Sequence, residues 1–295
     1  MELKDESDMK TPLSPTEVNS GLYHYMTYFY HATRQYWLSS RRFYALQQII
    51  RNQTLTTFFQ PILNLQNGTC LGYEVLNRPP VSALFPHTES FYDFIGQTDQ
   101  VFAFERFCRD ISFNRFRLAL IRSRKPADTI VFVNIHPQVL SDPGYRSGET
   151  IQLLSRYGLS PQQVVFELTE KQAVHDYVAF ERILSHYRSQ GFRIAIDDAG
   201  SGYNSLKAIV SLKPEFIKID KSLIRHLHLH PNQQRIVMLL QEFAAESGTH
   251  IIAEGIEEPE ERIFLQRVGI EYGQGYALGR PATEMSNDAV REIVQ

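Results

Sequence analysis

Residues 193–198 read RIAIDD, an apolar run that stops abruptly at two carboxylates, Asp197 and Asp198. Five more apolar segments end in the same way on one polar or charged residue: Glu74, Asn134, Glu167, Lys218 and Glu254. The carboxyl ends of the strands of an α/β barrel meet on one face, where the active site is built. The pattern therefore predicts a single site assembled from many strands.

The spacing of these strand ends fits the same fold. From Asn134 to Gln274, successive ends lie 20 to 36 residues apart, which suits one loop, one helix and one strand. We expect helices at residues 102–124, 150–157, 177–190, 223–230 and 232–247. The beginning differs, because residues 56–62 read as a strand and Asn67-Gly68 as a tight turn into the strand ending at Glu74. The barrel is thus expected to start with a hairpin.

The N-terminal region differs in amino-acid composition from the rest of the 295 residues. Residues 1–21 are polar and read as a tail, whereas residues 22–44 carry nine aromatic side chains on one or two expected helical stretches. Those aromatics either pack this segment onto the barrel or a second subunit, or form a regulatory or partner-binding surface. We place an N-terminal extension at residues 1–50 and the barrel at residues 51–295.

Composition excludes several classes of protein. The net charge of -3 and the pI near 6.4 give no broad positive field for DNA or an anionic membrane. The two cysteines, Cys70 and Cys108, lack metal-ligand spacing and are expected to be apolar fillers in a reducing compartment. No run approaches the roughly 20 apolar residues of a membrane span, and the N-terminus does not resemble a signal peptide. We therefore expect a cytoplasmic protein without a membrane span.

The strand-end residues indicate a metal site. Glu74, Asn134, Glu167 and Asp197 supply hard oxygen donors, which suit Mg²⁺ or Mn²⁺, with Ca²⁺ as a competitor. Crowded carboxylates need cations to neutralise them, and Asp197 could bridge to a second ion held with Asp198 and Glu254. Two ions of this kind can clamp an in-line displacement at phosphorus. The alternative, that each acid caps a helix or pairs on the surface, weakens when five acids share the same strand position.

Other polar residues are more ambiguous. Lys218 lies in an apolar strand, so it is either an edge-strand lysine or an inward lysine with an anion beside it. Arg78 lies where a rim loop begins and could bind a phosphate oxygen. His226, His228 and His230 alternate with leucines and are expected at a solvated helix end rather than in a metal site.

Seven short motifs resemble those of the EAL-domain phosphodiesterases, which hydrolyse cyclic di-GMP. In order along residues 58–281 they are GYEVLNR (72–78), VNI (133–135), ELTE (167–170), DDAGSGY (197–203), IKID (217–220), AEGIE (253–257) and QGY (274–276). The resemblance implies a (β/α)8 TIM-like barrel whose first strand is antiparallel. It also implies hydrolysis to linear pGpG with two Mg²⁺ or Mn²⁺ ions, inhibition by Ca²⁺, and a homodimer.

The resemblance also implies roles for individual residues. Glu74, Asn134, Glu167 and Asp197 correspond to ligands of the first metal, and Asp198 and Glu254 serve the second metal or its waters. Lys218 corresponds to the group that orients the attacking water, so the expected catalytic residues are Lys218, Glu254 and Asp198. Glu170 corresponds to the anchor of the loop after Asp198. Contacts to substrate, or contacts that support the metal ligands, are expected from Gln60, Arg78, Gln274 and Glu257, and a contact to substrate from Leu76.

The chain departs from the family pattern at three positions. Val75 replaces an alanine and is expected to pack away from the ions, while Ala199 replaces a phenylalanine and Asn204 a serine. None of these changes removes a ligand, but the two loop changes could loosen the dimer coupling. An alternative function is a weak or inactive domain that acts as a cyclic di-GMP receptor and signals through protein contacts. The complete set of acids favours the enzyme.

Overall fold

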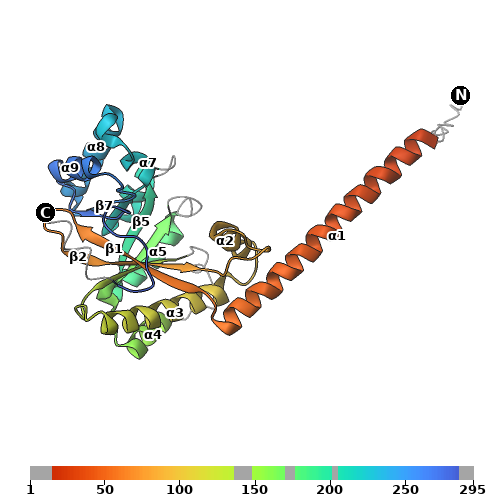
Figure 1. The fold of residues 1–295 in the computed structure, drawn as a ribbon, viewed down its shortest axis with the longest axis horizontal. Helices are drawn as coiled ribbons and strands as arrows, with labels where there is room; N and C mark the ends of the chain where they lie inside the picture. Colours follow the sequence, from red (N-terminus) through yellow and green to blue (C-terminus); the bar gives the residue numbers. More distant parts are fainter. Residues whose placement is uncertain (1–14, 136–147, 170–176, 201–204, 286–295) are drawn as a thin grey trace, which may run out of the picture.

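The computed structural model describes residues 15–135, 148–169, 177–200 and 205–285. In this part of the chain, eight strands close into one barrel in sequence order, with helices around it (Figure 1). The strands are β1 (Thr56–Asn64), β2 (Cys70–Arg78), β3 (Ile130–Asn134), β4 (Val164–Thr169), β5 (Arg193–Ala199), β6 (Phe216–Ile219), β7 (His250–Ala253) and β8 (Tyr272–Gly273). The predicted TIM-like fold is confirmed.

The antiparallel first strand is confirmed as well. β1 pairs antiparallel with both β2 and β8, whereas β2 to β8 pair in parallel. The turn between β1 and β2 is held by Asn64, whose side-chain oxygen accepts the backbone N–H groups of Gln66 and Asn67. Gly68 follows with φ of 72°, a conformation that glycine adopts without strain.

Most expected helices are present, within one or two residues of their predicted ends. The helices of the barrel are α2 (Thr88–Gly96), α3 (Val101–Arg122), α4 (Glu149–Tyr157), α5 (Tyr177–Ser189), α6 (Ser205–Leu212), α7 (Lys221–Ile224), α8 (Pro231–Ser247) and α9 (Pro259–Arg267). The helix predicted at residues 223–230 is wrong. α7 ends at Ile224, and His226 takes a left-handed φ of 55°, which breaks the chain into a short 3-10 turn, Leu227–Leu229.

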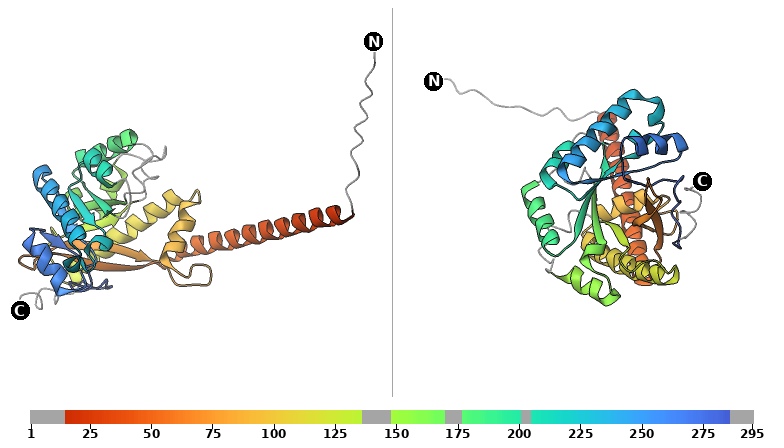
Figure 2. Two further views of the ribbon diagram at one scale, coloured as in Figure 1. Left: turned by 90° about the horizontal axis from the view of Figure 1, so that it is seen from above. Right: turned by 90° about the vertical axis from the view of Figure 1, so that its left-hand side faces the viewer.

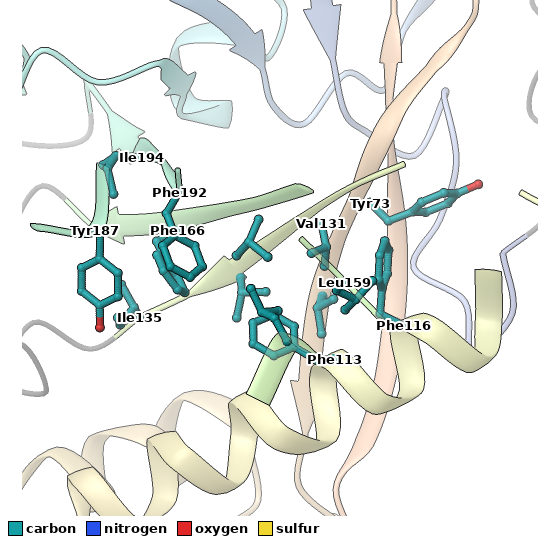
Figure 3. Close-up of a cluster of buried hydrophobic side chains, with 14 of the residues drawn as sticks. Tyr73, Phe113, Phe116, Val131, Ile135, Leu159, Phe166, Tyr187, Phe192 and Ile194 are labelled. Atoms are coloured by element: carbon teal, nitrogen blue, oxygen red, sulfur yellow. The ribbon is translucent and has the colours of Figure 1, made fainter. Parts of the chain in front are cut away.

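Two apolar layers explain why the strands read as continuous apolar runs. One layer fills the barrel and contains Ile62, Phe132, Val165, Ala195, Phe216 and Ile252, none more than 2% exposed. The other lies between the strands and the outer helices, where Phe166 packs against Tyr187 and Phe192 with ring centroids 5.0 Å apart (Figure 3). A parallel strand covered on both faces needs apolar side chains in both directions.

The described part of the N-terminal extension belongs to one continuous helix, α1 (Pro15–Asn52). Its last turns pack on the barrel through Leu46 and Ile49, which join a buried cluster with Phe85 and Phe91. The rest of α1 projects away from the barrel as an arm (Figures 1 and 2). The polar tail predicted over residues 1–21 is therefore wrong for residues 15–21, which are helical.

The aromatic side chains of the arm are exposed to solvent. Those from Tyr23 to Trp37 expose between 55% and 78% of their surface, so they do not pack on the barrel of their own chain. None of the helices in the described ranges is long and apolar enough to cross a membrane.

Candidate functional site

The site lies one layer above the apolar side chains that fill the barrel, which we call the apolar plug. Side chains two residues apart on a strand point to the same face. Each plug residue is therefore followed, two positions later, by an inward polar residue: Phe132 by Asn134, Val165 by Glu167, Ala195 by Asp197, Phe216 by Lys218 and Ile252 by Glu254. On the antiparallel β1 the order reverses, so Gln60 precedes Ile62.

Lys218 lies at the centre of this layer and is fully buried. Its Nζ lies 2.7 Å from Glu167 Oε1, 2.8 Å from Glu254 Oε1, 3.0 Å from Asp197 Oδ1 and 3.4 Å from Glu74 Oε2. Because β6 pairs with both β5 and β7, Lys218 is an inward lysine and not an edge-strand lysine. The structure thus brings four of the predicted acids around one ammonium group.

Asn134, at the end of β3, lies next to the acids that surround Lys218. Its side-chain nitrogen donates to Glu167 Oε2 at 3.2 Å and approaches Glu74 Oε1 at 3.4 Å. In-register pairing of Asn134 with Glu167 sets this position. The amide oxygen of Asn134 remains as a further hard donor beside the carboxylates.

Gln60 and Gln274 hold Glu74 from the side of β1 and β8. The side-chain nitrogen of Gln274 donates to Glu74 Oε2 at 2.6 Å and to Gln60 Oε1 at 2.9 Å. Gln60 in turn donates to the carbonyl of Gly279 at 3.2 Å. Gln274 thus holds Glu74 and contacts Gln60, while the predicted contacts of both glutamines with substrate stay predictions.

A second group of acids forms where β5 ends. Oxygens of Asp197, Asp198 and Glu254 lie within 4.8 Å of one another. Consecutive strand residues normally point to opposite faces, but the pairing of β5 with β6 shifts register between Ile196 and Ala199. Asp198 also has a left-handed φ of 56°, and its N–H donates to Asp197 Oδ1 at 3.1 Å. This bulge is what lets two neighbouring carboxylates serve one cluster.

The electrostatics favour bound cations. Burial, with Glu74 and Asp197 nearby, raises the pKa of Glu167 well above its usual range. Burial also raises the pKa of Glu254 to about 8, although Lys218 opposes the shift. Burial alone would lower the pKa of Lys218, but Asp197, Glu167, Glu254 and Glu74 raise it well above its usual range. Four carboxylates surround one ammonium, and Asp198 lies beside two of them. These oxygens are hard donors, and their excess negative charge fits Mg²⁺, Mn²⁺ or Ca²⁺.

A cavity of about 830 Å³ opens beside this cluster. Leu76, Arg78 and Asn134 line it from the strand side, and Tyr92 and Cys108 line it from α2 and α3. The Arg78 guanidinium stacks over the Phe58 ring at 5.2 Å. Sequence reasoning missed Tyr92 and its neighbours because α2 was not among the expected helices. The sequence signal for α2 was the spacing of Phe91, Phe94 and Ile95, which form the buried face of a short amphipathic helix.

The remaining predicted residues lie elsewhere or outside the described ranges. Glu257 forms an ion pair with Arg225 at 2.8 Å, on a largely exposed loop. Val75 packs in the layer between strands and helices, and Ala199 is fully buried among the outer side chains of β6 and β7. Glu170 and Asn204 fall outside the residues that the structure describes.

Two of the three histidines, His226 and His228, lie beside Glu258 in a structural cluster. His226 lies 3.1 Å from Glu258, and the buried carboxylate of Glu261 accepts the backbone N–H groups of His226, Glu257 and Glu258. Glu261 is therefore occupied as a helix cap, which leaves this group a poor metal site despite its acids and histidine.

Comparison with known proteins places these features in a family. The model of the EAL domain matches residues 44–281. The probable cyclic di-GMP phosphodiesterase PdeB of Escherichia coli is 31% identical over 245 residues, covering 80% of this chain and 44% of PdeB. Across eight curated relatives, the chain spans 20% to 59% of their length.

Solved structures agree on the fold. The EAL enzyme Bd1971 with cAMP and cyclic di-GMP bound is 26% identical with a TM-score of 0.75, covering 90% of this chain and 69% of that one. BlrP1 of Klebsiella pneumoniae, in a complex with manganese and cyclic di-GMP, is 26% identical with a TM-score of 0.68, covering 78% and 56%. A calcium complex of BlrP1 matches with a TM-score of 0.70 at the same identity, covering 79% and 57%.

Proposed function

Because the chain belongs to the EAL domain family, we propose that it is a metal-dependent phosphodiesterase that hydrolyses cyclic di-GMP to linear pGpG. Its activity would lower the level of this second messenger. The observation that carries the proposal is the contact of Lys218 with carboxylates from β2, β4, β5 and the end of β7. A receptor that only binds the nucleotide does not need this complete set of acids.

Two divalent cations fit the donors on either side of Asp197. Glu74, Asn134, Glu167 and Asp197 would hold one, and Asp197, Asp198 and Glu254 would hold the other. Bound Mg²⁺ or Mn²⁺ would lower the pKa of a water and clamp the phosphodiester group. Ca²⁺ would bind the same oxygens at longer distances and with a less regular coordination, and we expect it to inhibit hydrolysis.

The chain's own residues position the reactants. Lys218 carries three N–H donors on a fixed stem and can orient the attacking water between the carboxylates. Glu254, whose Oε1 lies 2.8 Å from Lys218 Nζ, would accept the proton that this water loses. Arg78 and Leu76 line the cavity wall, where they would contact a phosphate oxygen and a base, respectively.

The test is to incubate the purified chain with cyclic di-GMP and Mn²⁺ or Mg²⁺ and to separate the products. We expect linear pGpG, no product after chelation, and inhibition by added Ca²⁺. Binding of cyclic di-GMP without any linear product, at every metal concentration tried, would instead support the receptor interpretation.

A further inference from the structure

The arm of α1 carries a surface that the barrel does not use. Aromatic pairs recur every seven residues, at Phe29-Tyr30, Tyr36-Trp37 and Phe43-Tyr44. Their six rings expose between 39% and 78% of their surface. A strict seven-residue repeat keeps the same face of a helix turned toward a supercoiled partner helix. The pattern is thus that of a helix made to pack along another helix.

Small residues lie between the aromatic pairs. Thr33 falls between the first and second pairs, and Ser40 between the second and third, on the same face. Thr33 Oγ1 donates to the carbonyl of Phe29 at 2.9 Å, and Ser40 Oγ donates to that of Tyr36 at 2.9 Å. Both hydroxyl groups are therefore satisfied within the helix and can lose contact with water at little cost. Two aromatic ridges thus flank a floor of small side chains.

This aromatic face points away from the barrel. At its base α1 meets the barrel through Leu46 and Ile49, while Arg42 donates to the carbonyl of Leu84 at 3.2 Å. At 3.6 residues per turn, these three residues lie on the side of the helix roughly opposite the aromatic pairs. A second helix can therefore lie along the arm without meeting the barrel that α1 belongs to.

The face offers nearly the area of a specific interface. Its six aromatic side chains expose 39% to 78% of their surfaces, and each such side chain spans about 150–250 Å². Together they offer roughly 700 Å², close to the area of about 800 Å² that each partner contributes to a specific protein interface. The positive charges lie outside the centre of the contact, because Arg34 and Arg41 are at the edge of the face and the Arg41 guanidinium stacks over the Trp37 ring at 4.8 Å.

We propose that the aromatic face of α1 binds the same face of a second copy of this chain, as a helix pair separate from the barrel. The seven-residue repeat and the satisfied hydroxyls favour a helical partner over a lipid surface, which requires neither. The basic and aromatic composition of the arm makes anionic lipid the alternative to be tested. The proposal does not depend on the enzymatic activity.

The fluorescence of Trp37 reports directly on this contact, because Trp37 is the single tryptophan of the chain and is 61% exposed. As the concentration of the full chain rises, we expect its emission to shift to shorter wavelength and its quenching by acrylamide to fall. Light scattering in the same samples should show the mass of a dimer or of a higher even-numbered assembly.

Two variants separate the arm from other contacts. Ser40→Glu places a charge on the floor of the aromatic face and should weaken the concentration-dependent shift roughly tenfold or more. Gln35→Glu adds the same charge on the opposite side of the helix and should leave the shift unchanged. A pairing of barrels alone would change the mass without moving the Trp37 signal.

Two results would overturn the proposal. One is a Trp37 signal that stays that of an exposed side chain at every concentration, or that responds equally to Ser40→Glu and Gln35→Glu. The other is a blue shift that needs phosphatidylglycerol vesicles and does not depend on protein concentration, which would assign the face to a membrane surface.

Discussion

Lys218 Nζ lies 2.7 Å from Glu167 Oε1, and both side chains are completely buried. A buried ion pair of this kind costs desolvation energy, and removing one partner leaves a buried charge behind. The pair is therefore weak as a source of stability but strong as a means of holding a reactive ammonium in place.

Asp197→Asn should abolish turnover while leaving the fold intact. A neutral amide cannot bridge two cations, yet it has nearly the volume of the carboxylate. We expect a loss of hydrolysis of at least about a hundredfold with an unchanged circular dichroism spectrum. Asp128→Asn, which changes an exposed acid, is the matched control. Near-normal activity of Asp197→Asn would show that the ligand assignment is wrong.

Lys218→Met should slow hydrolysis by about 10²–10⁴-fold, because a group that orients water and moves protons contributes on that scale. The metal-free variant should also melt at a lower temperature, since four carboxylates lose their ammonium partner. Mn²⁺ should restore part of this loss in a thermal melt. A variant with wild-type rate would exclude a catalytic role for Lys218.

Metal binding should release protons at neutral pH. The pKa of Glu254 is about 8 without metal, so its carboxyl is mostly protonated at pH 7 and must lose that proton to bind a cation. Metal affinity should therefore rise as the pH rises from 7 toward 9. Calorimetry in two buffers of different ionisation enthalpy measures the released protons, and Glu254→Gln should release fewer. Equal heats in both buffers would contradict the assignment.

Gln274→Leu should weaken metal binding by about 10–100-fold, the usual effect of losing a group that orients a ligand. The substitution removes the donor 2.6 Å from Glu74 Oε2 but leaves every predicted ligand in place. Activity should therefore recover at high Mn²⁺ concentration, as a rise in the metal requirement without a fall in the maximal rate. A loss of maximal rate that metal does not restore would point to a contact with substrate instead.

The strand ends were predictable from sequence because each strand of the barrel is covered on both faces. Its apolar run is therefore continuous, and the first polar residue marks the mouth. Glu74 is the exception in detail: β2 continues four residues past it to Arg78, because β1 pairs along that whole length.

Other features depend on contacts that sequence does not display. The bulge that turns both Asp197 and Asp198 into one cluster arises from the register between β5 and β6. The short helix α9 was not among the expected helices, although the sequence marks its start. Pro259 stands at its first turn, and Glu258 forms a capping box with Glu261. α2 carried a signal too, in the spacing of Phe91, Phe94 and Ile95, but it is only nine residues long and is stabilised by burial against α3.

The metal centre is tested most directly by diffraction from crystals grown with Mn²⁺, recorded at the manganese absorption edge. We expect two anomalous peaks, one among Glu74, Asn134, Glu167 and Asp197, and a second beside Asp197, Asp198 and Glu254. Manganese bound only at the His226–Glu258 surface cluster, or absent from the carboxylates around Lys218, would contradict the two-metal site.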